Sequence, residues 1–351
     1  CCIQKTLNIR MTEGNIKNFE IIRKYFKNGC LKHSDILLSL LHYRLPYLKN
    51  AGIILKLYKS SSTAVATYSK DITISRYQAN CSHAIVMKLY ITKKINKFIS
   101  GAFLHGSLGT NELVNYSDFD ALIILNHSTF HSKQSLVKVA TTLKKSERIM
   151  QEMDPLQHHG WFVITEKELD NFPINYFPPS LFEHAKCLIG NNAFQIHYQK
   201  PTIATKLHLF YSYCNHLMNN LNRIEQNLNF YEVKSLLSGF MLLPSVYLQL
   251  TSPEGIFKKD SFDLLKQKLS DEEYEIMNQV SEIRANWAYQ SPMLYKIILS
   301  LNSSAINNFF KKTNSGKIPT SLRSILLDMR PAMTNFIQTL LTKAKHEVQI
   351  D

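Results

Sequence analysis

Residues 101–125 constrain the fold more than any other part of the chain, because two apolar, strand-like runs enclose a polar stretch. The runs are GAFLH at 101–105 and FDALIIL at 119–125, and each has the composition of a buried strand. A third such run, HHGWFVI at 158–164, follows a predicted helix over 132–150. Strands that are separated by a long helix predict a mixed α/β core in this part of the chain.

The chain changes character beyond Pro201, where only helical patterns occur. A capping box formed by Ser270 and Glu273 predicts the start of one helix. Another helix is predicted by apolar residues that repeat at alternating steps of four and three, namely Ile203, Leu207, Phe210, Cys214, Leu217, Leu221, Ile224 and Leu228. We therefore expect residues 201–351 to form a helical C-terminal domain.

Composition narrows the class of protein. A chain of 351 residues, 45% of them apolar, can bury the core of one or two domains. No apolar run approaches the ~18 residues of a membrane-spanning helix, so we expect no membrane partner. The six cysteines show no CxxC spacing, which argues against a zinc site or a disulfide framework and favours a reducing, cytoplasmic setting. A start at Cys1 instead of Met leaves open whether residues precede it.

The net charge of +14 is concentrated in the first hundred residues. Residues 1–100 hold 17 Lys and Arg against 4 Asp and Glu, whereas residues 101–351 hold 24 against 23. Such basic segments are most often solvated helix faces, but they can also bind RNA or another polyanion. The candidate contacts for a polyanion are Lys24, Lys27, Lys93 and Lys94.

Helical spacing predicts helices over 16–26, 34–45 and 82–98, the last with Ile85, Leu89, Ile95 and Phe98 as its apolar residues, and a loop over 59–71. We accordingly expect three units. These are a basic, helix-rich segment at 1–80, a catalytic domain at 81–200 and the helical domain at 201–351.

Gly106, Ser107, Asp118 and Asp120 carry the chemistry of the central segment. Side chains alternate along a strand, so Asp118 and Asp120 share one face while Phe119 points into the core. Two adjacent carboxylates repel unless a cation neutralises them, and Mg²⁺ or Mn²⁺ suits such a pair when phosphates supply further oxygens. Gly106 permits close approach of a phosphate to the backbone, and Ser107 offers a hydroxyl.

The order strand, Gly106-Ser107, ten residues, Asp118-x-Asp120 and strand resembles the signature of the nucleotidyltransferase superfamily related to DNA polymerase beta. The resemblance covers residues 101–125 closely and 82–200 loosely. It implies an α+β fold with a mixed sheet and flanking helices, followed here by a helical bundle. It also implies transfer of a nucleoside monophosphate from an NTP, expected to be ATP, to an acceptor hydroxyl. In this family the paired acids hold two Mg²⁺ ions.

The family usually adds a third carboxylate on a later strand, and this chain departs from that pattern. The predicted strand over 157–164 carries His158 and His159 and no acid, while Asp154 precedes it. Three alternatives stay open. Asp154 can serve as the third acid, a histidine such as His159 can replace it as base or ligand, or the site can lack its second metal.

The acceptor also stays open among a small hydroxylated molecule, a protein side chain and an RNA 3′ end. The missing strand acid motivates an alternative function, a non-catalytic module that keeps the fold and binds a nucleotide or nucleic acid.

Overall fold

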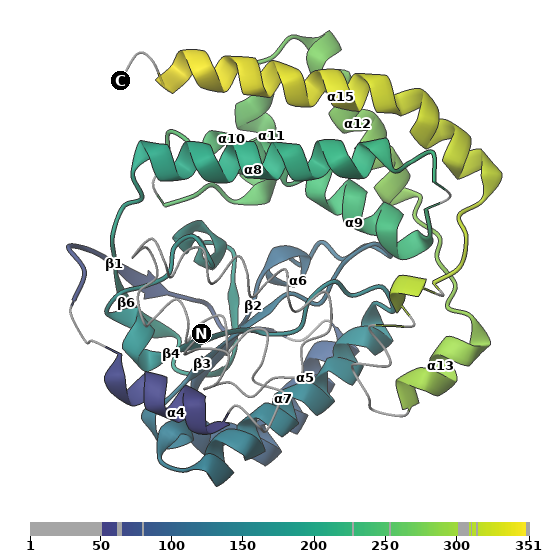
Figure 1. Cartoon of the computed structure of the whole chain (residues 1–351). Helices are drawn as coiled ribbons and strands as arrows, with labels where there is room; N and C mark the ends of the chain where they lie inside the picture. The colour runs from purple at the N-terminus through teal and green to yellow at the C-terminus, as the bar shows by residue number, and fades with distance from the viewer. Residues whose placement is uncertain are drawn as a thin grey trace, which may run out of the picture.

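A computed structural model of the chain describes residues 51–61, 65–78, 81–226, 228–252, 254–300, 309, 311–313 and 315–348. The helices expected over 16–26 and 34–45, together with Lys24 and Lys27, lie outside the described residues. The predicted α+β class is confirmed, because a mixed sheet with helices is followed by a layer of helices (Figure 1).

The central sheet has four strands in the order β4-β3-β2-β5. Its strands are β2 (Ile99–Leu104), β3 (Ala121–Leu125), β4 (Phe162–Thr165) and β5 (Lys186–Gly190). β2 pairs antiparallel with both β3 and β5, and β3 pairs parallel with β4. Leu104 pairs with Ala121, so the end of β2 and the start of β3 meet at one edge of the sheet. A separate antiparallel pair consists of β1 (Tyr68–Thr73) and β6 (Ala193–Tyr198).

β3 is buried along its whole length because both faces of the sheet are covered. Ala121, Ile123 and Leu125 pack into a core with the helices before and after the strand, whereas Leu122 and Ile124 pack into a second core with β1 and β6. A strand between two covers must be apolar at every position, which is why the run reads ALIIL.

The helices on the sheet body differ in length and position. They are α4 (Ala51–Ser60), α5 (Ser82–Ile95), α6 (Gly106–Thr110) and α7 (Lys133–Met153), with short 3-10 helices at Asn96–Phe98, His127–Phe130, Glu166–Leu169 and Pro179–Phe182. α4 and β1 pack on this body, because α4 contacts α7 and β1 pairs with β6.

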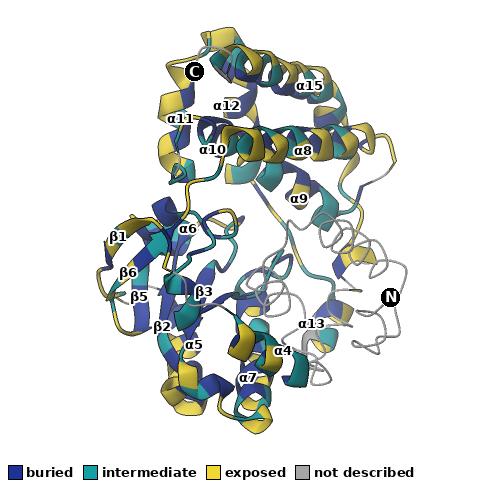
Figure 2. Cartoon of the chain, turned by 60° about the vertical axis from the view of Figure 1, so that its left-hand side comes forward, coloured by how far each residue is buried: buried dark blue, intermediate teal, exposed yellow. Residues whose placement is uncertain are grey.

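The helical layer follows β6 and lies to one side of the sheet body (Figure 1). It contains α8 (Ile203–Asn222), α9 (Phe230–Phe240), α10 (Leu243–Leu248), α11 (Lys258–Lys266), α12 (Asp271–Ala285) and α15 (Thr320–Val348). α13 (Met293–Ser300) lies apart from this layer, and its Tyr295 hydroxyl donates to Pro155 O of the sheet body (Figures 1 and 2). α8 and α15 pack against each other, and buried faces from both enclose a third core (Figure 2). No helix among the described residues is long and apolar enough to cross a membrane.

Several predicted elements need correction at their ends. The strand expected over 157–164 is limited to Phe162–Thr165, and the loop expected over 59–71 contains the start of β1. The helix expected over 82–98 is present, but Ile85 and Leu89 are exposed. Ile95 and Phe98 are buried as predicted, and the rest of the buried face is Ala84, Met87 and Ile91, so the prediction was wrong at Ile85 and Leu89.

The capping box at Ser270 is confirmed, because its side chain accepts a hydrogen bond from Glu273 N at 3.2 Å and Glu273 accepts one from Ser270 N at 2.9 Å. We expect Ser270→Ala to lower the free energy of unfolding by about 1 kcal/mol, since one helix-end N–H loses its partner. Urea unfolding measures this, with the exposed helical Ser324→Ala as control. Equal effects in the two variants would contradict the capping role.

Candidate active site

Gly106 and Asp120 meet at the edge where β2 ends and β3 begins. His105 N donates to Asp120 O at 3.1 Å, which ties the turn to the acid segment. Gly106 has φ +60° and begins α6, and a Cβ at this position would lie 2.4 Å from Asp120 Oδ2. The turn therefore needs glycine both for its backbone conformation and for the space that the carboxylate occupies. Ser107 is the next residue of α6 and is half-buried.

Gly106→Ala tests this arrangement. We expect the free energy of unfolding to fall by at least about 1–2 kcal/mol, the cost of a left-handed conformation for a residue with a Cβ. Displacement of Asp120 should weaken metal-dependent nucleotide binding as well. Gly52→Ala in α4 is the matched control, because its Cβ would meet only the end of the Lys133 side chain. A Gly106→Ala protein as stable as wild type would exclude the tight turn.

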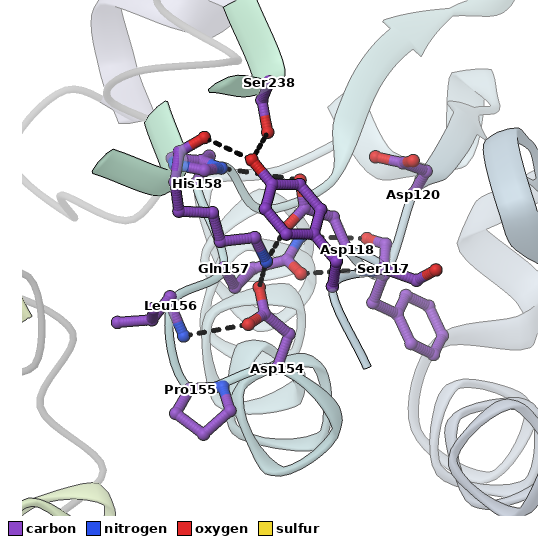
Figure 3. A network of polar contacts seen from close by, with 12 residues as sticks. Ser117, Asp118, Asp120, Asp154, Pro155, Leu156, Gln157, His158 and Ser238 are labelled. Atoms are coloured by element: carbon purple, nitrogen blue, oxygen red, sulfur yellow. Dashed lines mark hydrogen bonds and ion pairs between the residues drawn. The ribbon is translucent and has the colours of Figure 1, made fainter. Parts of the chain in front are cut away.

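Asp118 and Asp120 both precede β3, and Phe119 between them is fully buried in the core. The expected alternation of side chains is thus present, although it lies in extended chain before the strand. Gln157 holds this chain in place, because its Oε1 accepts from Phe119 N at 2.7 Å and its Nε2 donates to Phe119 O at 3.0 Å. Figure 3 shows Gln157 beside Asp118.

Lys234 of α9 lies between two carboxylates. Its Nζ is 2.7 Å from Asp118 Oδ1 and 2.8 Å from Asp154 Oδ2, and its side chain is 0% exposed. Asp154 caps the end of α7, and its Oδ1 accepts from Leu156 N at 3.0 Å (Figure 3). Asp154 is therefore part of the site, although it lies before the strand where the third acid was expected.

Each of the two histidines contacts one acid of the motif. His158 Nδ1 is 3.4 Å from Asp118 Oδ2, and His159 Nε2 is 3.0 Å from Asp120 Oδ1. The His158 ring also packs against Tyr231 of α9 with centroids 5.1 Å apart. Both histidines thus belong to the acid network.

Tyr116 fixes α9 against the acid segment. The Tyr116 hydroxyl donates to Lys234 O at 2.6 Å and lies 2.9 Å from Ser238 Oγ. Its ring is 2% exposed and lies under Lys234 Nζ at 5.0 Å and under the Arg284 guanidinium at 4.6 Å. These contacts explain how a helix distant in sequence delivers a lysine to the acids.

Charge pairing controls protonation in the network. Burial alone would raise the pKa of Asp118, but the charge of Lys234 and the contact with His158 hold it well below its usual range. Burial raises the pKa of Asp154 to about 8, with Lys234 opposing and the Asp118 charge adding. Burial disfavours the charged form of His159, yet its hydrogen bond to Asp120 outweighs this and raises the pKa of His159 to about 9. At neutral pH His159 is an imidazolium.

Two cationic residues of the helical layer face the motif acids. Burial and then the Arg284 charge lower the pKa of Lys258 to about 7, while the charges of Asp120 and Asp118 oppose this. Arg284 Nε is buried without a hydrogen-bond partner among the described residues. Lys258 opens α11 and interacts with the charges of both acids, while Arg284 lies in the last turn of α12 over the Tyr116 ring.

The structure brings together the predicted residues Gly106, Asp118, Asp120, Asp154 and His159. Ser107 lies beside them in the same turn. Sequence reasoning missed five residues, which are Tyr116, Lys234, Ser238, Lys258 and Arg284. The burial of Lys234 could have been predicted from the sequence, since Lys234 is the lone charged residue in the window Val233 to Leu237 of α9. A lysine among apolar residues is rarely buried unless it pairs with an acidic side chain.

The residues fit one divalent ion better than two. Asp118 and Asp120 offer carboxylates on one face, and Mg²⁺ commonly binds one or two carboxylates together with substrate phosphates. Among the described residues no group of three or more His, Cys, Asp or Glu side chains is arranged to hold a metal. Asp154 Oδ1 accepts from Leu156 N and its Oδ2 lies 2.8 Å from Lys234 Nζ, so a second ion at Asp154 would lie beside the ammonium group.

Comparison with solved structures finds a structural likeness. It is to the crystal structure of spectinomycin adenyltransferase AAD(9) from Enterococcus faecialis with ATP and spectinomycin, at 14% sequence identity and a TM-score of 0.33. The match covers 66% of this chain and 100% of that one. No family model and no curated protein matches the sequence. Similarity at this level transfers no activity, so function is argued from the site.

Proposed function

We propose that the chain is a metal-dependent nucleotidyltransferase that transfers a nucleoside monophosphate from an NTP, with ATP as the expected nucleotide. The observation that carries the proposal is the contact between the two halves of the motif. The Gly106 turn closes on Asp120, and Asp118 lies two residues away on the same segment. A phosphate-binding turn beside two carboxylates is what a metal-bound triphosphate requires.

Asp118 and Asp120 are the proposed ligands of Mg²⁺ or Mn²⁺. The ion would neutralise charge on the phosphates and on the leaving pyrophosphate. Gly106 and Ser107 would contact the triphosphate from the turn. Lys258 would face it from the helical layer, because its side chain lies within reach of the charges of Asp120 and Asp118, and the charge of Arg284 acts on Lys258.

In the proposed reaction the oxygen of an acceptor hydroxyl attacks the α-phosphorus. A new P–O bond forms, the bond between the α-phosphorus and the bridging oxygen breaks, and pyrophosphate leaves. The proton of the hydroxyl passes to a base. Asp154 is the proposed base, since a pKa of about 8 suits proton acceptance near neutral pH, whereas the His159 imidazolium already holds its proton.

This assignment predicts the pH dependence of turnover. The rate should rise about tenfold per pH unit below pH 8 and level off above it, because only ionised Asp154 accepts a proton. Initial rates of pyrophosphate release between pH 5.5 and 9.5 measure this. His159→Gln should keep the rising limb. A rising limb that is lost in His159→Gln but kept in Asp154→Asn would assign the base to His159.

The proposal itself is tested by thermal shift with each NTP, with and without Mg²⁺ or Mn²⁺, followed by a pyrophosphate assay with candidate acceptors. We expect an NTP to raise Tm only when the metal is present. Pyrophosphate should appear with an acceptor bearing a hydroxyl. A chain that binds no NTP in any metal would contradict the proposal.

A second candidate function is a binding module that keeps the fold without turnover. It is favoured by the pairing of the acids, because Lys234, His158 and His159 neutralise them with groups of the protein itself. Such a module would bind NTP and release no pyrophosphate with hydroxylated small molecules, protein side chains or RNA 3′ ends.

The basic N-terminal region carries a separate proposal, that the acceptor is RNA or another polyanion. Lys93 and Lys94 are exposed in the last turn of α5, while Lys24 and Lys27 lie outside the described residues. We expect RNA affinity to fall steeply with salt, and neutralisation of Lys93 and Lys94 to reduce the slope of log K against log salt by about 1 per lysine. Fluorescence anisotropy between 50 and 200 mM salt measures this. An RNA affinity that does not change with salt concentration would exclude RNA as the acceptor.

A further inference from the structure

We propose that the buried ammonium group of Lys234 takes the place of a second divalent cation, so that the site binds one divalent ion with its nucleotide. The inference rests on the proposed function and states which cations the site accepts. It follows from the position of Lys234, from its contacts, and from the carboxylate oxygens of Asp118 and Asp120 that Lys234 does not contact.

Lys234 is built into the network. Its Nζ contacts Asp118 and Asp154 at 2.7 and 2.8 Å, and these two carboxylates lie on either side of it. Its backbone oxygen accepts the Tyr116 hydroxyl, and the Tyr116 ring lies 5.0 Å from Nζ. A side chain that is 0% exposed and held at both ends has no solvent-facing position to move to.

The carboxylate oxygens show which ion remains possible. Asp154 Oδ1 accepts from Leu156 N, and its Oδ2, which has no hydrogen-bond partner among the described residues, faces Lys234 Nζ at 2.8 Å. Asp118 Oδ1 lies 2.7 Å from Lys234 Nζ and its Oδ2 lies 3.4 Å from His158 Nδ1, and its carboxyl group also interacts directly with that of Asp154. One oxygen edge of Asp118, together with Asp120, is therefore left for one divalent ion.

Charge favours the same conclusion. Asp118 and Asp154 carry two negative charges when ionised, and Lys234 neutralises one of them directly between the carboxylates. A second divalent ion bound to this pair would sit beside a buried ammonium group, and like charges at such distances repel strongly in an interior of low dielectric. The ion would need Lys234 to leave, and its packing opposes this.

Mn²⁺ binding tests the inference without turnover. Purified wild-type protein is saturated with a nonhydrolysable ATP analogue that has a methylene group between the α- and β-phosphorus, and free Mn²⁺ is measured by electron paramagnetic resonance. We expect one Mn²⁺ in all per complex of chain and analogue, so that the protein adds no second ion to the one that the analogue carries in a protein-free control. Two Mn²⁺ ions per wild-type complex would overturn the inference and leave the proposed function standing.

Variants separate the role of Lys234 from that of Asp154. Asp154→Asn should bind one Mn²⁺ with an affinity within about twofold of wild type, because Asp154 is not a ligand of the ion. A tenfold loss of Mn²⁺ affinity would show that Asp154 is a ligand and would contradict the inference. Lys234→Ala should admit a second ion. Lys311→Ala is the matched control, since Lys311 is also buried but donates to the Gln157 carbonyl and not to a carboxylate.

The outcomes are separable. If Lys234→Ala does not fold, as judged by circular dichroism, the wild-type and Asp154→Asn stoichiometries still decide. A folded Lys234→Ala protein that binds only one ion would show that the ammonium group does not exclude the second. Wild-type protein that binds neither the analogue nor Mn²⁺ would remove the proposed function and this inference together.

Discussion

Asp118→Asn is expected to abolish metal-dependent transfer while the protein stays folded. The substitution keeps the shape of the side chain but removes the charge that would hold the metal beside Asp120. Loss of several kcal/mol of metal-derived stabilisation corresponds to a fall in turnover of at least about 10²-fold to 10³-fold. Pyrophosphate release with a validated acceptor measures the effect, and circular dichroism confirms the fold.

Asp328→Asn is the matched control for this prediction, because Asp328 is an exposed carboxylate on α15. It should keep wild-type turnover. Asp120→Asn should behave like Asp118→Asn, although it loses the His159 contact and not the Lys234 contact. Wild-type turnover in either motif variant would remove the nucleotidyltransferase assignment.

Lys234→Met is expected to cause the largest loss of stability that a single substitution in this site can produce. Methionine fills a similar volume, but it leaves Asp118 and Asp154 buried without their shared cation. Breaking a buried pair in this way costs about 3–5 kcal/mol, because an uncompensated buried charge remains. Urea unfolding at pH 7 measures the change.

The size of this loss should depend on pH. Without Lys234 the folded-state pKa of Asp118 rises above the unfolded value of about 3.9, and that of Asp154, which is already about 8, rises further, since burial favours the neutral form. A group whose pKa is raised by folding contributes stability below its unfolded pKa and loses it as pH rises. The variant should therefore approach wild type near pH 4 and fall further below it as pH increases toward 8.

The double variant Lys234→Met, Asp154→Asn tests the cause. Removing one carboxylate charge together with the ammonium should recover part of the lost stability, which gives a coupling energy between the two positions. Additive losses, or a loss in Lys234→Met that does not change with pH, would show that Lys234 stabilises the protein by packing and not by charge.

Much of the sheet body could be predicted from local pattern. The run ALIIL is β3, Ser132 caps α7 as the helix expected over 132–150 requires, and the Ser270 capping box opens α12. The strand expected from Gln157 was misplaced because Gln157 forms hydrogen bonds with the chain around Phe119 in place of a strand ladder. The prediction of the buried face of α5 was wrong at Ile85 and Leu89. Both are apolar but exposed, and local spacing does not reveal this.

The sequence by itself determined the elements whose cause is local. The turn at Gly106 and Ser107 can be predicted from these two residues and their neighbours. The acid pair can be predicted in the same way from the residues on either side of the buried Phe119. What the third acid does was decided by tertiary structure alone. Asp154 and Asp118 are joined by Lys234, which lies 80 residues further along the chain from Asp154 on α9 and is held there by Tyr116. A contact of this kind depends on how two cores pack together, and no local pattern records it.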